Sequence, residues 1–195
     1  MKKKTIAYLG KAGPKECPGC LAATVERAKE LKIKHAVVAT TSGRTALALA
    51  RAFEKASVKC RVVGVGYAQN YADRWGHLDA KVVRQAEKLG AEFVRGGHAM
   101  GGINSGIQDK FGTVTPNKII ANTYYTIGHG FKVAVEVVLM AADACAIPLG
   151  REVMALGGAG KGADTSLVVL SRSSAEFFDL RVREIVCMPR SDKRK

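Results

Sequence analysis

The sequence predicts a three-layer α/β/α domain, with helices on both faces of a mixed, mostly parallel sheet. Two observations predict this class. Short stretches rich in β-branched residues alternate with longer amphipathic stretches, and glycine-bearing connections separate them. The composition agrees, because 47% hydrophobic and 25% charged residues are close to the average of globular proteins. No repeat or linker divides the 195 residues, so residues 1–195 are expected to form one domain.

Strands in the first half are expected where apolar runs are short and β-branched, as in residues 61–65. The first helix is expected because Leu21, Val25 and Ala28 are spaced to bury one helical face. Gly90 suits the position just after a helix, where a left-handed residue closes the last turn. These patterns predict strands at residues 5–9, 35–39, 59–66 and 91–94, and helices at residues 21–31, 44–56 and 78–89.

The second half begins with a long glycine-rich connection over residues 95–115. Pro116 then suits the first position of a helix, where its missing N–H group costs nothing. The longest apolar stretch carries Lys132, Glu136 and Asp143, so it is expected to be a buried helix and not a membrane span. The patterns predict helices at residues 116–127, 131–147 and 173–178, and strands at residues 152–156, 166–170 and 182–188.

The formal net charge of +14 raises the question of a polyanionic partner. The two tails carry +6 of this charge, and the basic residues between them are spread over many elements without interleaved aromatic residues. We therefore do not expect nucleic acid as the main partner, whereas an anionic small molecule would benefit from the field. The apolar run at residues 5–10 is too short for a signal peptide, so we expect a cytoplasmic protein that is not bound to a membrane.

Five cysteines in such a chain are expected to be reduced thiols. Cys60, Cys145 and Cys187 lie in apolar segments and are interpreted as small core residues. Cys17-Pro18-Gly19-Cys20 precedes the first expected helix. A CxxC pair at a helix start can cycle with a disulfide. No second CxxC pair exists to complete a zinc site, so we expect no metal. Two incidental cysteines are the favoured interpretation.

The strongest chemical signal is the loop between the strand at residues 35–39 and the next helix. A helix N-terminus offers unpaired N–H groups and a partial positive charge, so it binds anions readily. Gly43 would let the backbone approach a ligand closely, and Arg44 would add a charged contact. The alternative is plain capping of the helix by Ser or Thr. The candidate phosphate-binding residues are Thr41, Ser42, Gly43, Arg44 and Thr45.

Residues 157–165 form a second glycine-rich candidate. Gly158, Gly160 and Ala163 match the dinucleotide-binding pattern formally, but that pattern requires a helix after the turn. Here the turn leads into a predicted strand, so the Rossmann interpretation fails. A flexible loop with Lys161 remains a candidate clamp over phosphates or a ring, and the alternative is a mobile connection that contacts nothing.

Two further groups are candidates for ligand contacts. His98 lies among four glycines, which predicts a segment at the surface or against a ligand, although a lone histidine is more often structural. Lys132, Glu136 and Asp143 share one helical face. The Lys132–Glu136 spacing suits a structural ion pair, and a stripe that faces a ligand or another subunit is the sharper interpretation.

Residues 37–46, VVATTSGRTA, resemble the effector-phosphate loop of the pyruvate kinase C-terminal domain. The chain as a whole resembles the stand-alone proteins of archaeal and bacterial type that consist of a pyruvate kinase C-terminal-like domain. The other stretches that carry the resemblance are GHA at residues 97–99, GFKVAVE at 130–136, MAAD at 140–143, GADT at 162–165 and EIVCMPR at 184–190.

The resemblance implies a domain that binds a phosphorylated ligand and joins subunits into a homo-oligomer. It implies no pyruvate kinase activity, because the catalytic barrel of that enzyme has no counterpart here. Stand-alone relatives look like binders of flavin mononucleotide (FMN), so FMN is the preferred ligand and a sugar phosphate sensed by a regulatory protein the alternative. A flavin- and thiol-dependent oxidoreductase is a further alternative. Besides residues 41–45, the implied ligand-binding residues are His98, Gly101, Gly102, Gly158, Gly160, Lys161, Asp164 and Thr165.

Overall fold

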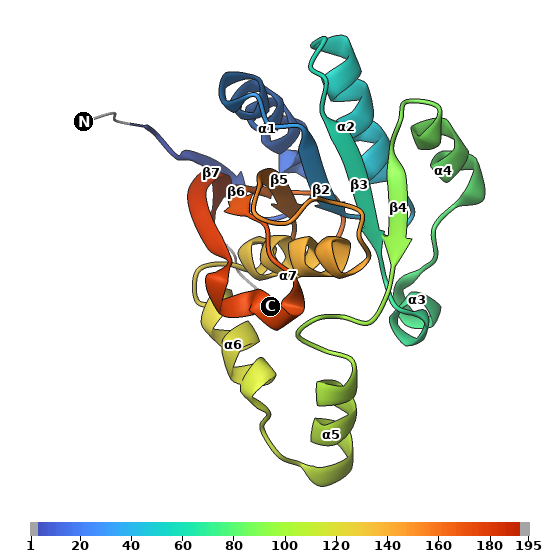
Figure 1. The fold of residues 1–195 in the computed structure, drawn as a ribbon, viewed down its shortest axis with the longest axis vertical. Helices are drawn as coiled ribbons and strands as arrows, with labels where there is room; N and C mark the ends of the chain where they lie inside the picture. The colour runs from blue at the N-terminus through green and yellow to red at the C-terminus, as the bar shows by residue number, and fades with distance from the viewer. Residues whose placement is uncertain (1–3, 192–195) are drawn as a thin grey trace.

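A computed structural model describes residues 4–191, which form one sheet and the helices around it (Figure 1). The sheet has seven strands in the order β1-β7-β6-β5-β2-β3-β4. The strands are β1 (Ala7–Lys11), β2 (His35–Ala39), β3 (Arg61–Gly66), β4 (Glu92–Arg95), β5 (Glu152–Gly157), β6 (Thr165–Leu170) and β7 (Arg181–Ser191).

Helices alternate with strands through the first half of the chain, as far as β4, and three helices then follow in succession. Two short 3-10 helices, η1 (Pro14–Glu16) and η2 (Ser174–Asp179), precede α1 and β7. The α-helices are α1 (Cys17–Leu31), α2 (Arg44–Lys55), α3 (Gln69–Trp75), α4 (Ala80–Glu87), α5 (Ile103–Phe111), α6 (Pro116–Tyr125) and α7 (His129–Asp143).

The sheet is mixed and mostly parallel, as predicted. β5, β2, β3 and the edge strand β4 all run in one direction. β6 runs antiparallel to both β5 and β7, and β1 pairs in parallel with β7 at the edge. Within residues 4–191, β6 is therefore the one strand that runs against the others, and it separates the parallel half β5-β2-β3-β4 from the edge pair β1-β7.

Alternating side chains of the central strands pack against different helical layers. Val37 and Val63 belong to the core formed with α7, whereas Ala36, Val38 and Val62 belong to the core formed with α1 and α2. Figure 1 shows the same division, with α1 and α2 on one face of the sheet and α7 on the other. The three-layer α/β/α class is confirmed. None of the helices within residues 4–191 combines the length and the apolar character that crossing a bilayer requires.

The sequence interpretation missed two helices. α3 and α5 are short, with one buried residue and none respectively, so neither has the apolar periodicity that announces a helix. α1 begins at Cys17, four residues earlier than predicted, because Pro18 fits its first turn. The predicted helix at residues 131–147 ends early at Asp143, and Cys145 adopts a left-handed φ of 55° beyond it. Cys145 is therefore exposed, which corrects its assignment to the core.

The topology brings four strand ends to one edge of the sheet. The paired residues Val38 and Leu156 lie just before the carboxyl ends of β2 and β5. The chain leaves β2 toward β3 and β4, then returns on the other side of β2 as β5. The gap between β2 and β5 is thus a topological switch point, where ligands collect in open α/β sheets.

Candidate functional site

The start of α2 lies at this switch point, with Arg44 exposed, Thr41, Ser42 and Thr45 partly exposed, and Gly43 and Ala46 buried. Its N-cap residue is Gly43, which has a left-handed φ of 90° and provides no side-chain cap. Thr40 Oγ1 accepts the N–H of Gly43 at 3.0 Å and closes the turn before the helix. The backbone N–H groups of Arg44, Thr45 and Ala46 have no acceptor among residues 4–191. Such a helix start can accept an anion.

Two neighbouring helices show what ordinary capping looks like in this fold. Asp79 Oδ1 accepts the N–H of Lys81 at 2.8 Å, and Thr115 Oγ1 accepts the N–H of Lys118 at 3.4 Å. Ser42 does not act in this way, because it lies before the N-cap position and its carbonyl accepts the N–H of Asp79 at 3.1 Å. The capping alternative is therefore wrong for α2.

The structure gives a reason for glycine at position 43 that the sequence analysis did not give. A Cβ atom at this position would lie 3.3 Å from Val82 and 3.5 Å from Phe93, so the side of Gly43 that would carry a side chain packs against α4 and β4. The left-handed backbone alone also favours glycine. Gly43 therefore shapes the turn, and the N–H groups that an anion could approach belong to the next residues of the helix.

The glycine loop, defined as residues 158–164, connects the antiparallel strands β5 and β6. This hairpin confirms that the Rossmann pattern is coincidental. Asp164 Oδ2 accepts the N–H groups of Gly13 at 3.0 Å and Ala159 at 3.3 Å, and the Thr165 hydroxyl donates to Asp164 Oδ1 at 3.0 Å. Both side chains are buried, so they hold the loop in place, whereas Gly160 and Lys161 are exposed at its tip.

The glycine loop and the start of α2 begin side by side. β2 and β5 are hydrogen-bonded neighbours with Val38 opposite Leu156, so Thr40 and Gly158 are both two residues beyond a paired position. Neighbouring strands lie about 4.8 Å apart. The structure therefore brings together the two loops that the sequence analysis paired.

His98 follows β4 and packs among aromatic side chains. Its ring centroid lies 4.5 Å from that of Tyr71 and 5.8 Å from that of Tyr67, and Tyr71 stacks on Trp75 at 5.1 Å. The side chain is 16% exposed, and Nε2 has no hydrogen-bond partner within residues 4–191. Burial lowers the pKa of His98, with Glu136 opposing the shift and Lys132 adding to it. The imidazole is therefore neutral at neutral pH.

The buried ion pair of α7 holds the connection after β4 that carries His98. Lys132 Nζ contacts Glu136 Oε2, and Glu136 Oε1 accepts the N–H of Met100 at 3.0 Å. Both members of the pair are buried, whereas Asp143 is exposed and accepts the N–H of Ser174 at 2.8 Å. The expected polar stripe is thus divided, and only Lys132 and Glu136 adjoin the candidate site.

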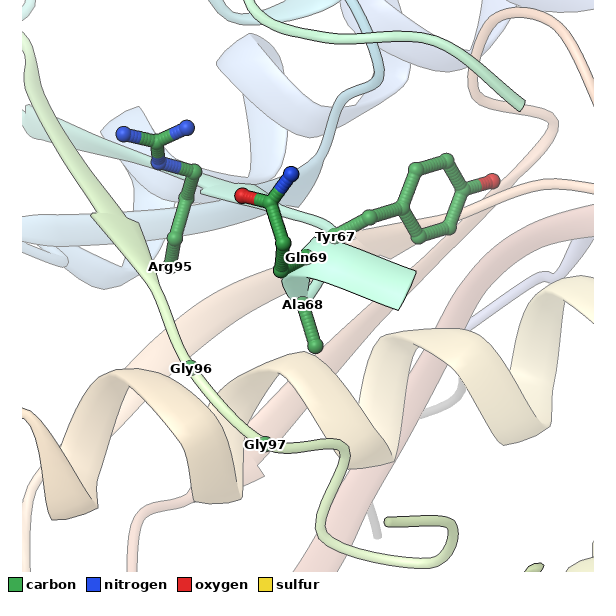
Figure 2. A pocket seen from close by; sticks show the side chains of 6 residues that line it. All are labelled: Tyr67, Ala68, Gln69, Arg95, Gly96 and Gly97. Carbon is green, nitrogen blue, oxygen red and sulfur yellow. The ribbon is translucent and has the colours of Figure 1, made fainter. Parts of the chain in front are cut away.

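A cavity of about 280 Å³ opens at the carboxyl ends of β3 and β4. Figure 2 shows the end of β4 and the following glycines on one side of it and the residues after β3 on the other. The lining residues are Tyr67, Ala68, Gln69, Arg95, Gly96 and Gly97. Residues 41–45 do not line it, but Ala39 pairs with Val65, so Thr41 and Tyr67 leave neighbouring strands at the same level.

Sequence reasoning missed Tyr67, Tyr71, Trp75 and Arg95. A signal existed, because the three aromatic residues recur every four residues directly after a strand, in a chain with only 6% aromatic residues. Within a helix that spacing puts side chains on one face, and α3 contains Tyr71 and Trp75, whereas Tyr67 lies in the connection before it. The aromatic group, defined as Tyr67, Tyr71, Trp75 and His98, is the largest addition that the structure makes to the predicted site.

Comparison with known families gives a match over most of the chain. The family described as pyruvate kinase, alpha/beta domain, matches residues 19–169. The matched region contains α2, the aromatic group, α7 and the glycine loop, and it omits β1, η1 and β7.

Proposed function

Since the chain belongs to the pyruvate kinase alpha/beta domain family, we propose that it binds a phosphate-bearing small molecule, preferably FMN, at the switch point between β2 and β5. One observation carries the proposal: at the start of α2, three backbone N–H groups have no acceptor among residues 4–191, and they lie at the edge of the sheet where ligands collect. The proposal assigns binding and no pyruvate kinase activity.

The phosphate would lie against the N–H groups of Arg44, Thr45 and Ala46. The exposed guanidinium of Arg44 would add a charge-assisted contact, and Lys161 at the tip of the glycine loop would approach from β5. The net charge of +14 favours any anion at this edge. Gly101 and Gly102 lie in the turn after His98, where Gly101 N–H bonds the carbonyl of His98 at 3.0 Å.

The aromatic group favours a flat ring over a sugar as the rest of the ligand. Aromatic faces stack well on planar ring systems, and Trp75 is 51% exposed. His98 Nε2, which has no partner in the described part of the chain, would supply one polar group for the ring, and the charged Arg95 lines the cavity. These features fit FMN, whose flavin is planar and whose phosphate is anionic. A sugar phosphate would also use the start of α2, but its ring would offer the aromatic group no planar π surface.

The test is a fluorescence titration of FMN, with riboflavin as the ligand that lacks the phosphate. We expect riboflavin to bind at least tenfold more weakly, which corresponds to about 1.4 kcal/mol. Arg44→Gln should weaken FMN binding about tenfold or more, because a hydrogen bond to a charged group contributes about 1.5 kcal/mol or more.

Arg51→Gln is the matched control. It removes the same charge from the same helix, seven residues or about 10 Å further along the axis. Equal effects of the two substitutions, or equal affinity for FMN and riboflavin, would contradict a phosphate site at the start of α2. Binding of ribose 5-phosphate with no binding of FMN would replace the flavin by a sugar phosphate.

A further inference from the structure

Two buried cysteines meet between α1 and β7. Cys20 and Cys187 are both 0% exposed, and Cys187 lies opposite Ser166 in the β6–β7 ladder. The hydroxyl of Thr24, one turn after Cys20, lies 2.8 Å from Ser166 Oγ and 2.7 Å from the Cys20 carbonyl. A hydrogen bond between the two thiols raises the pKa of Cys20 and lowers that of Cys187. Cys20 therefore holds its proton in the reduced protein.

A third cysteine lies nearer to the surface, at the start of the same helix as Cys20. Cys17 is the first residue of α1 and is partly exposed. The N–H of Ala163 points at Cys17 Sγ, with nitrogen and sulfur 3.5 Å apart. A Cβ atom on Gly162 would lie 3.2 Å from Cys17 Cβ and 3.3 Å from Pro14 Cα, so the glycine loop rests directly on the start of α1.

We propose that Cys17 and Cys20 form a redox-active dithiol that exchanges with small-molecule disulfides and whose oxidation releases the glycine loop. Cys17 is the thiol that solvent can reach, and it lies at a helix start, where the partial positive charge is greatest. Cys20 follows one turn later on the same helix, within the CxxC spacing used by disulfide oxidoreductases.

The exchange balances as two thiol–disulfide steps. The Cys17 thiolate attacks one sulfur of a disulfide RSSR, which forms a mixed disulfide and expels one RS⁻ that takes up a proton. Cys20 then loses its proton and attacks the Cys17 sulfur, which forms the Cys17–Cys20 disulfide and expels the second RS⁻. Two protein thiols are oxidised and one RSSR is reduced to two RSH.

The disulfide must change the first turn of α1. Cβ atoms three residues apart on a helix are separated by about 5–6 Å, whereas a disulfide needs about 3.5–4.5 Å. Closing this gap draws Cys17 Sγ toward Cys20 and away from the N–H of Ala163. The glycine loop then loses one of its contacts with α1, while Asp164 still binds Gly13. Any consequence for ligand affinity rests on the proposed function; the disulfide and the loop response do not.

The test is incubation of the folded protein with glutathione disulfide, followed by acid quenching, alkylation and tryptic mapping. Trypsin releases residues 16–27, which contain Cys17 and Cys20, and residues 184–190, which contain Cys187. We expect the first peptide to escape alkylation, with a mass two hydrogens below that of its free dithiol form, and the second to be alkylated at Cys187. A cross-link between the two peptides would overturn the assignment in favour of Cys20–Cys187. Unchanged peptides, or a stable glutathione adduct on Cys17, would overturn the dithiol.

Two variants and one loop measurement complete the test. Cys20→Ser should stop the reaction at the glutathione adduct on Cys17, whereas Cys187→Ser should still form the disulfide. Amide hydrogen exchange at Ala163 should become at least fivefold faster in the oxidised wild-type protein. Unchanged exchange would refute the release of the loop. All these measurements are made without ligand, so failure of FMN to bind would leave them interpretable.

Discussion

Gly130→Ala sets helix propensity against packing at the start of α7. Alanine is favoured over glycine inside a helix by about 0.8–1.0 kcal/mol, so the substitution would stabilise an unobstructed site. At this site a Cβ atom would lie 2.2 Å from Thr165 Oγ1 and 2.7 Å from both Thr165 Cβ and Asp164 Oδ1. These atoms are buried and hydrogen-bonded to each other, so they cannot move aside cheaply.

Packing should win. Overpacking of a buried site costs about 1–3 kcal/mol, and overlaps of this size belong at the upper end. The net loss should therefore be on the order of 2 kcal/mol, which lowers the melting temperature by about 4–8 °C for a chain of this size. Urea unfolding monitored by circular dichroism measures the difference directly.

Gly106→Ala provides the matched control. Gly106 lies inside α5, and a Cβ atom there would meet nothing within 4 Å. This variant should be as stable as the wild type or gain up to about 1 kcal/mol. If Gly130→Ala proved equally stable, the close packing of α7 against β6, and with it the position of the glycine loop, would be refuted.

Three other predictions concern charge, pH and association. Glu136→Gln should lower the free energy of unfolding by about 3–5 kcal/mol, because the Lys132 ammonium is left buried without its partner. The double variant Lys132→Met/Glu136→Gln should be more stable than Glu136→Gln, and a less stable double variant would refute this explanation. Burial lowers the pKa of His98 in the folded state, so the unfolded chain binds the proton more readily. The free energy of unfolding should therefore fall by up to about 1.4 kcal/mol per pH unit as the pH drops from about 7 toward 5. Urea unfolding should show a flatter profile for His98→Gln, and identical profiles would contradict this account. Ile103 and Phe111 on α5 are 82% and 67% exposed, which predicts self-association through this helix; sedimentation should show an oligomer that Ile103→Lys/Phe111→Lys converts to a monomer, and a monomeric wild type would refute it.

The parallel half of the fold could be predicted closely because its signals are local. β2 was predicted with its observed bounds and α2 within one residue. A short β-branched run and an amphipathic helix can each be recognised from a single short stretch of sequence. α5 gave no such signal, because a helix of nine residues with no buried side chain has no apolar stripe, and the only signal for the seven-residue α3 was its recurring aromatic residues.

The loops of the candidate site could be predicted, but the long-range contacts that position its side chains could not. The loops after β2 and β5 were paired through a family resemblance, and the register of Val38 with Leu156 gives the physical reason. The inward position of Asp164 depends on Gly13, 151 residues away, and no local pattern encodes such a contact. The aromatic group likewise depends on the loop after β4 folding back toward α3.

A crystal structure of the protein with FMN tests the central claim most directly. The account predicts phosphate oxygens within about 2.7–3.2 Å of the N–H groups of Arg44, Thr45 and Ala46, which is ordinary hydrogen-bond distance. It also predicts the flavin ring against the aromatic group, toward the cavity beside Arg95. A phosphate bound elsewhere, with the start of α2 open to solvent, would contradict the account.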